Sequence, residues 1–180
     1  MLPVFGDGDG WTRCAQGHRH WGIFGAAGLL LRHVDADGVE RILLQHRALW
    51  SHHGGTWGVL GGARNSGETA AYTAEREAGE EAGVVPGSYE VVGEYVDDHG
   101  GWSYTTVVGR AATAFATPHL TSESLAVGWV DVTRLHDLPL HPGFAATWPA
   151  VRLTHCTTDS AFHRGLLTTK AVPSQTGLVT

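Results

Sequence analysis

Four glutamates lie close together in the segment GGARNSGETAAYTAEREAGEEAGV, residues 61–84. They are Glu75, Glu77, Glu80 and Glu81. Like charges at helical neighbour spacing repel by a few tenths of a kcal/mol, and by more where water is excluded. A segment that holds so many carboxylates together therefore needs either exposure to water or a positive partner.

The segment after residue 69 has the pattern of a helix. Thr69 is of the N-cap type, and Gly83 is placed to end the helix in the left-handed conformation. At about 100° per residue, one narrow apolar stripe contains Ala74, Ala78 and Ala82. On the same wheel Glu77, Glu80 and Glu81 share an arc of about 100° beside that stripe, whereas Glu75 lies on its other side. The chemically relevant group is therefore a trio.

Two interpretations of the trio stand on geometry alone. Most glutamate-rich helix faces are simply solvated, but such faces usually alternate in sign, and no cationic residue falls within this arc. Alternatively, a hard divalent cation such as Mg²⁺ or Mn²⁺ would turn the repulsion into binding, because these ions prefer oxygen ligands and leave positions open for phosphate oxygens.

Composition narrows the class of protein. The chain has 180 residues and a net charge of −6, so we expect one domain and no binding to duplex nucleic acid. Two cysteines are too few for a disulfide framework and fit a reducing compartment. The N-terminus lacks signal-peptide features, and the longest apolar run, residues 22–31, is about half of a bilayer span. We expect a cytoplasmic protein without a membrane partner.

Hydrophobic patterning predicts the elements that position the glutamates. Strands are expected at 21–33, 41–49, 89–96, 104–116 and 125–132, with a short strand near 56–60 and a final helix over 142–153. This order predicts a mixed α+β domain over residues 21–154. Residues 1–20 are expected to form a loosely attached N-terminal arm, and residues 155–180 a C-terminal tail or docking extension.

Residues 62–84 resemble the Nudix box, G-x5-E-x7-R-E-U-x-E-E-x-G-U, where U is aliphatic. The matches are Gly62, Glu68, Arg76, Glu77, Ala78, Glu80, Glu81, Gly83 and Val84. Ala78 is small for its position, and VLGG at 59–62 replaces the usual proline-containing turn, but neither change removes a ligand. The resemblance to MutT-like Nudix hydrolases implies the Nudix fold, a mixed β-sheet sandwiched between α-helices.

The resemblance also implies a reaction: hydrolysis of a nucleoside diphosphate linked to another moiety, by attack of water on phosphorus. Mg²⁺, or Mn²⁺ in its place, would be held by Glu77, Glu80, Glu81 and the carbonyl of Gly62. Glu68 and Arg76 would fix the loop to the helix through a charge-assisted contact.

The general base has candidates inside and outside the box. Within it we favour Glu77. Outside it we favour Glu123, ahead of Asp97 and Asp98, because an entry position of a strand can face the cleft.

Other residues are candidates for substrate binding. Arg47 is placed to hold phosphate, Gly61 lies beside the box, and Trp57 or Trp102 could stack on a base, although aromatic residues at such positions more often serve in packing. His52 and His53 lie in the loop before the box, where a solvated pair is the simpler interpretation.

A second candidate metal site lies near the N-terminus. Cys14, His18 and His20 are soft-metal ligands that His155 and Cys156 could complete, but no Cys-x-x-Cys motif is present, and a packed loop or mobile arm is favoured.

Three functions compete at this point. The leading one is the divalent-metal-dependent pyrophosphohydrolase. A nucleotide-binding sensor that does not cleave its ligand is the alternative, disfavoured because every box glutamate is present. An isopentenyl-diphosphate isomerase-like enzyme would need a cysteine near the box, and residues 15–155 contain none.

The substrate is not identified by the sequence. The downstream proline and tyrosine that mark ADP-ribose and dinucleoside polyphosphate hydrolases are absent, since Gly100 and Trp102 occupy those positions. A dNTP or oxidised dNTP is the default. The arm and the tail are candidates for a homodimer contact.

Overall fold

A seven-stranded mixed sheet forms the centre of the computed structural model, which describes residues 6–117 and 121–154. Its longest strands are β3 (Ala26–Val34), β4 (Glu40–Arg47), β7 (Tyr89–Asp98), β8 (Ser103–Ala111) and β9 (Ser124–Asp131). The short strands β5 (Trp57–Gly58) and β6 (Leu60–Ala63) complete it. β3 runs parallel to β8 and antiparallel to β4 and β6, and β4 also pairs with β9. The sheet therefore brings segments from both halves of the chain around β3.

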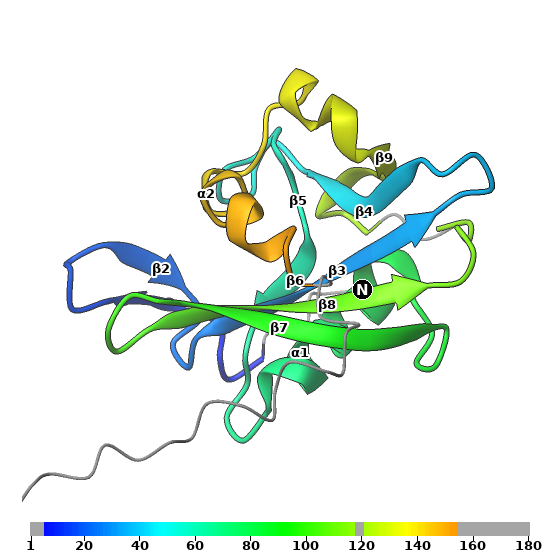
Figure 1. Ribbon diagram of the computed structural model, residues 1–180. Coiled ribbons are helices and arrows are strands. Elements are labelled where there is room, and N and C mark those ends of the chain that lie inside the picture. The colour runs from blue at the N-terminus through cyan, green and yellow to red at the C-terminus, as the bar shows by residue number, and fades with distance from the viewer. Residues whose placement is uncertain (1–5, 118–120, 155–180) are drawn as a thin grey trace, which may run out of the picture.

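Helices cover both faces of this sheet (Figure 1). On one face lies α1 (Ala70–Ala82), whose alanines join Leu29, Leu43 and Val107 in a buried cluster. On the other face lie α2 (Pro142–Val151) and the 3-10 helix η1 (Val132–Asp137), which bury Phe144, Val151 and Leu135 against Leu30 and Leu44. Because successive side chains of a strand point to opposite faces of the sheet, Leu29 and Leu30 of β3 belong to different clusters. The predicted sandwich is confirmed.

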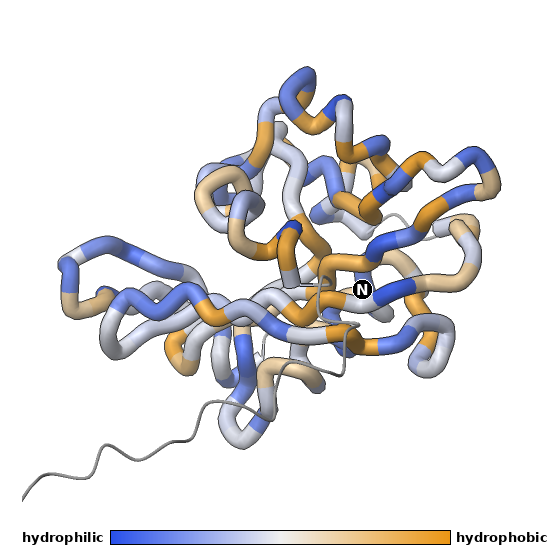
Figure 2. Tube along the Cα trace, in the orientation of Figure 1, coloured by the Kyte–Doolittle hydropathy of each residue, from blue (hydrophilic) through white to orange (hydrophobic). Residues whose placement is uncertain are grey.

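Hydropathy follows the same layering. Hydrophobic residues concentrate along the central strands and hydrophilic ones at the outer turns (Figure 2). The turn between β3 and β4 shows how such a loop is fixed, because Oδ1 of Asp35 accepts hydrogen bonds from the amides of Asp37 and Val39, and Gly38 adopts a φ of 79°. No helix among residues 6–117 and 121–154 is long and apolar enough to cross a bilayer.

The N-terminal segment is more ordered than its composition predicts. β1 (Trp11–Arg13) and β2 (Arg19–Trp21) pair as an antiparallel hairpin, and residues 6–9 contact the loop before α1. Strands of only three residues carry too little alternation to be recognised in the sequence. The division of the chain into arm, domain and tail stays a prediction, and residues 155–180 lie outside the described part.

Two further elements differ from expectation. β8 ends at Ala111 instead of continuing to residue 116, because the chain turns so that Phe115 packs on the α1 side of the sheet. There the carbonyl of Phe115 accepts a hydrogen bond from the indole of Trp129, at 3.0 Å. η1 was not predicted. Pro149 lies inside α2, which nevertheless extends to Val151.

Candidate metal centre and active site

The helix α1 carries the glutamates and is capped at both ends as predicted. The hydroxyl of Thr69 accepts a hydrogen bond from the amide of Tyr72 at 3.2 Å. Gly83 adopts a φ of 66°, and its amide donates to the carbonyl of Gly79 at 2.9 Å. Only a residue without a side chain adopts this conformation readily. The caps therefore fix where the helix starts and stops relative to the sheet.

The alanine stripe sets how closely α1 approaches the sheet. Ala74, Ala78 and Ala82 are almost completely buried. Small side chains let the helix lie against β3 and β6, so Glu81 and Glu77 on the flank of the stripe meet β6 at Gly61 and Gly62. Glu75 points elsewhere and accepts a hydrogen bond from the hydroxyl of Tyr89 at 3.4 Å. The separation of Glu75 from the other three glutamates is confirmed.

Glu81 is the most deeply placed of the trio, with 5% of its surface exposed. Its Oε1 accepts a hydrogen bond from Nε2 of Gln45 at 2.8 Å, and its Oε2 accepts one from the amide of Gly61 at 2.9 Å. Burial and the nearby charge of Glu77 raise the pKa of Glu81 to about 8, although both hydrogen bonds favour the ionised form. Glu81 is thus a carboxylate held in place at an energetic cost.

Glu77 lies directly over the backbone of the box turn. A Cβ atom added to Gly62 would come within 2.5 Å of Oε1 of Glu77, so only glycine allows this approach. Burial raises the pKa of Glu77 to about 7, against the opposing effect of Arg76, and the charges of Glu80 and Glu123 raise it further. Glu80, by contrast, is solvent-facing, with 62% of its side chain exposed.

Arg76 connects the carboxylates in a way the helical wheel did not predict. The wheel places no cationic residue within the glutamate arc, yet Nη1 of Arg76 lies 2.7 Å from Glu77 and 3.5 Å from Glu80. A long arginine side chain can extend across the helix surface, so the angle of its Cα atom on the helical wheel does not show where its guanidinium group lies. The cluster therefore carries one positive charge of its own.

The predicted contact between Glu68 and Arg76 is present and bidentate. Nε and Nη2 of Arg76 donate to the two carboxylate oxygens of Glu68 at 3.0 and 3.1 Å, and Nη2 also donates to the carbonyl of Ala63. Burial alone would raise the pKa of Glu68. Hydrogen bonds from Arg76, Asn65 and Thr73 outweigh burial and lower that pKa to about 2. This network fixes the loop before α1 to the helix.

The donor set suits a hard divalent cation. Two of the three carboxylates have raised pKa values because each is buried near other negative charges, and a cation would relieve that repulsion directly. The absence of a Cβ at Gly62 keeps the backbone open beside Glu77. Oxygen-only ligands of this kind match Mg²⁺ or Mn²⁺ and not a soft metal.

Some substrate and base candidates lie near the trio. The amide of Gly61 donates a hydrogen bond to Glu81. The charge of Arg47 lowers the pKa of Glu81, and Nε of Arg47 donates a hydrogen bond to the carbonyl of His52. Glu123 is exposed just before β9 and acts electrostatically on Glu77. The structure therefore gathers Arg47, Gly61 and Glu123 around the box.

Other candidates are engaged elsewhere. Trp57 packs on the α2 side of the sheet and stacks on His46 at 4.8 Å, on the face opposite α1, so the structure does not bring it to the glutamates. Asp97 contacts His99, and Asp98 accepts the amide of Gly100, each within its own loop. The ring of Trp102 stacks on His20. His52 and His53 form a group with His141.

Gln45 and Tyr104 are site residues that the sequence reasoning missed. Gln45 is fully buried, and its Nε2 bridges Glu81 and the hydroxyl of Ser124 at 2.8 and 2.7 Å. The hydroxyl of Tyr104 lies over Gly61, and burial together with the charge of Glu81 raises the pKa of Tyr104. A single amide within the apolar strand ILLQH was the available signal for Gln45. No comparable signal marked Tyr104.

Comparison with known proteins identifies a family. The model of the NUDIX domain matches residues 26–151. A protein of Mycobacterium tuberculosis named "Putative 8-oxo-dGTP diphosphatase 3" is 49% identical over 166 residues, which are 88% of this chain and 75% of that protein. A nucleoside triphosphate pyrophosphatase/Nudix hydrolase fusion protein of Bifidobacterium longum is 42% identical over 84% of this chain and 33% of its own length.

A solved structure shows the same architecture. The Nudix hydrolase RenU of Mycobacterium smegmatis superposes with a TM-score of 0.78 at 44% identity, covering 84% of this chain and 97% of that one. The agreement extends over almost the whole of that protein, so the fold around the glutamate helix is shared and not only the box.

Proposed function

Because the chain belongs to the Nudix family of hydrolases, which cleave a diphosphate linkage in nucleotide substrates, we propose that it hydrolyses a nucleoside triphosphate with Mg²⁺. An oxidised dGTP is the proposed preferred substrate. The substrate proposal is supported by the name of the M. tuberculosis relative, of which this chain covers 75%. The catalytic proposal is carried by the assembly of Glu77, Glu80 and Glu81 on one flank of α1.

Glu77, Glu80, Glu81 and the carbonyl of Gly62 are the proposed ligands, with Mn²⁺ as an alternative to Mg²⁺. When bound, a divalent cation neutralises charge on the bridging and leaving oxygens and lowers the pKa of a coordinated water. Glu81 is oriented for this role by Gln45 and Gly61. Arg76 would act as a positioning residue, because it holds Glu68 on one side and Glu77 on the other.

Glu77 is the proposed proton acceptor. Its Oε1 is occupied by Nη1 of Arg76 at 2.7 Å, which leaves Oε2 to take a proton. Burial raises the pKa of Glu77 in the metal-free protein, and a bound cation would lower it again, which would keep Glu77 ionised and able to accept a proton. Glu123 is the second candidate, and its charge already acts on Glu77. Arg47 is proposed to bind a substrate phosphate, as a cation beside a mainly acidic site.

A substrate panel tests the proposal. The panel contains dNTPs, 8-oxo-dGTP, ADP-ribose, NADH, dinucleoside polyphosphates and sugar nucleotides, each with Mg²⁺ or Mn²⁺, and kcat/KM is measured. We expect 8-oxo-dGTP to give the highest value. A preference for ADP-ribose or a dinucleoside polyphosphate would overturn the substrate class, and tight binding without turnover would favour the sensor.

A matched pair of variants tests the metal ligands. Glu80→Gln should lose nearly all turnover with the best substrate. Glu75→Gln changes the same residue type on the same helix, but Glu75 contacts Tyr89 away from the trio and should keep turnover. Equal turnover in the two variants would refute the ligand assignment whatever the substrate is.

The setting of the enzyme is also proposed from the sequence. Two cysteines and a net charge of −6 support a cytoplasmic protein that does not bind duplex nucleic acid. A homodimer stays a prediction, which sedimentation of the full chain would test.

A further inference from the structure

A second group of metal-binding side chains lies well outside the glutamate cluster. Cys14, His18, His20 and His99 each offer a ligand atom, and these four atoms all lie within 4.8 Å of one another. Three come from the β1–β2 hairpin and one from the loop between β7 and β8. We propose that these four residues form a structural site for a borderline-soft divalent cation, with Zn²⁺ as the primary candidate.

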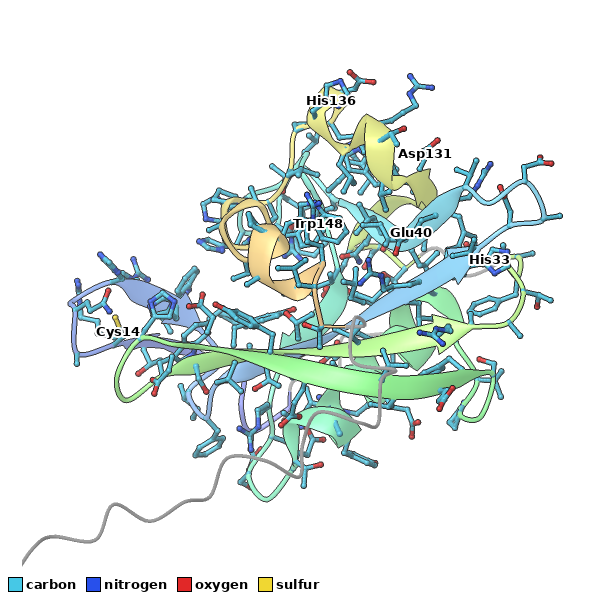
Figure 3. The ribbon with its side chains drawn as sticks, in the orientation of Figure 1. Cys14, His33, Glu40, Asp131, His136 and Trp148 are labelled. Atoms are coloured by element: carbon cyan, nitrogen blue, oxygen red, sulfur yellow. The ribbon has the colours of Figure 1, made fainter. Side chains whose placement is uncertain are left out.

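The backbone shapes the hairpin so that its ligands converge. The amide of Cys14 donates to the carbonyl of His18 at 3.1 Å, and the amide of Gly17 donates to the carbonyl of Cys14 at 2.9 Å. Gly17 adopts a φ of 83°, which suits glycine. Cys14 lies near the end of this hairpin, against the neighbouring β7–β8 loop (Figure 3). The amide of Ala15 donates to Gly100 of that loop at 2.7 Å, so the two loops are already joined.

Two buried imidazole nitrogens without hydrogen-bond partners in the described part of the chain are separate evidence for a ligand at this site. Nε2 of His20 and Nδ1 of His99 are buried and have no hydrogen-bond partner within the described residues. A buried polar atom without a partner is costly and calls for an explanation. Both nitrogens belong to the four-residue group. A bound cation would satisfy both at once.

Neighbouring side chains already hold these rings in orientations that suit a metal. Nε2 of His99 lies 3.0 Å from Oδ2 of Asp97, which fixes the proton on Nε2 and leaves the lone pair on Nδ1. Such carboxylate–histidine pairs commonly support metal ligands. The ring of His20 stacks on Trp102 at 3.9 Å and 12°, and the indole of Trp102 donates to the carbonyl of Gly22. The site therefore has a supporting shell, including a role for Asp97 and Trp102 that the glutamate cluster does not use.

The donor set and its charge favour Zn²⁺. One thiolate and three imidazoles are soft and borderline ligands, which match Zn²⁺ and not Mg²⁺. In a tetrahedral site the ligand atoms lie about 3.3–3.8 Å apart, so no pair of ligand atoms would need to move closer by more than about 1.5 Å. Binding requires the Cys14 thiol to lose its proton to solvent. Zn²⁺ and the thiolate then leave one positive charge, which the carboxylate of Asp97 balances through His99.

The position of the site indicates a structural role. It would hold the β1–β2 hairpin to the β7–β8 loop. Residues 6–9, which precede the hairpin, contact the loop before α1: Asp7 accepts hydrogen bonds from the amide and hydroxyl of Ser66, and Asn65 accepts one from the amide of Gly8. An ion at the hairpin thus supports the segment next to the glutamate site without touching it.

Metal titration of the full chain tests the proposal. The reduced protein is stripped with a chelator, dialysed and titrated with Zn²⁺ in excess Mg²⁺, which keeps the box carboxylates occupied. We expect one Zn²⁺ per chain to bind tightly. Co²⁺ in its place should give a thiolate-to-cobalt charge-transfer band and the intense visible bands of tetrahedral cobalt. A chain that binds no Zn²⁺ under these conditions overturns the proposal.

Matched variants assign the site. Cys14→Ser should abolish the charge-transfer band, and His99→Gln should weaken Zn²⁺ binding by at least about 10-fold. Two variants serve as controls. Cys156→Ser keeps Cys14 and should retain the charge-transfer band. His53→Gln changes the separate group of His52, His53 and His141 and should retain the affinity for Zn²⁺. The assignment is refuted if Cys156→Ser loses the charge-transfer band. It is also refuted if His53→Gln loses Zn²⁺ binding while Cys14→Ser still binds Zn²⁺ as the wild type does. Circular dichroism of each metal-free variant verifies folding, so a loss of binding is read only on a folded chain.

Discussion

Replacing Glu81 by glutamine should stabilise the metal-free protein while removing its activity. Glu81 is buried beside Glu77, so its negative charge costs free energy that a neutral amide avoids. Both contacts of residue 81 can be kept in altered form. The new side-chain oxygen accepts from the amide of Gly61, and the new NH₂ group donates to Oε1 of Gln45 once the Gln45 amide turns over. Nε2 of Gln45 then gives up Ser124 and takes the buried position in which Oε1 has no partner among the described residues, a cost that keeps the gain below its electrostatic ceiling.

The magnitude follows from the pKa of Glu81. This pKa rises from 4.5 to about 8 in the folded protein, and each pKa unit corresponds to 1.36 kcal/mol at 25 °C, which sets a ceiling of about 5 kcal/mol. Between these two pKa values the folded state binds more protons than the unfolded state. The wild type therefore loses stability as the pH rises from about 5 to above 8, and Glu81→Gln avoids its share of that loss. We expect the variant to be about 2–5 kcal/mol more stable at pH 8.5 and nearly equal at pH 5.

Urea unfolding in the presence of a chelator measures this difference. Both proteins are unfolded at pH 5, 7 and 8.5, and the free energies of unfolding are compared. Saturating Mg²⁺ should stabilise the wild type at pH 8.5 much more than the variant, because a bound cation offsets the charge that the variant lacks. A variant that is less stable than the wild type at pH 8.5, or a difference that does not change with pH, would refute the electrostatic reasoning.

Three further predictions concern the same helix and its loop. Glu80→Gln should leave the urea midpoint of the metal-free protein unchanged, since its side chain is 62% exposed, but lower kcat at least about 100-fold in a turnover assay. Gly62→Ala should displace Glu77, because the added Cβ would lie 2.5 Å from its Oε1, and should weaken Mn²⁺ binding measured by electron paramagnetic resonance. Gly79→Ala, whose Cβ meets nothing closer than 3.5 Å, is the control and should bind Mn²⁺ normally. Glu68→Gln should cost about 2–4 kcal/mol of unfolding free energy at pH 7, because Arg76 loses its bidentate carboxylate partner and keeps only its contacts with Glu77 and Glu80. The pKa of Glu68 is lowered to about 2, so this deficit should shrink as the pH falls from about 4.5 towards 2, and a constant deficit would contradict the pairing.

The glutamate helix was predictable because its determinants are local. The N-cap, the C-terminal glycine, the alanine stripe and the spacing of the carboxylates all lie within one short segment. Helical periodicity alone separated Glu75 from the trio. The reach of Arg76 was the exception, since a Cα direction does not say where a flexible side chain ends.

The rest of the site depends on which strands lie beside each other. Gln45 reaches Glu81 only because β4 and β6 both border β3, and nothing in the segment around residue 45 contains that pairing. Trp57 was assigned to the substrate side on residue type, but which face of a strand it occupies depends on register. The convergence of His99 with Cys14 likewise joins loops distant in sequence, which spacing rules for a single segment cannot detect.

The contact of residues 6–9 with the loop before α1 has a consequence for the order of folding. Gly8 meets Asn65, and Asp7 meets Ser66, across sequence separations of 57 and 59 residues. Contacts that close long loops form slowly relative to local ones, and this one cannot form before the box segment has been synthesised. The helix and sheet can thus assemble first, with the N-terminal segment docking afterwards as a late and separable step. Amide hydrogen exchange should accordingly find the amides of Gly8 and Ser66 opening without the sheet, at a lower free energy than global unfolding.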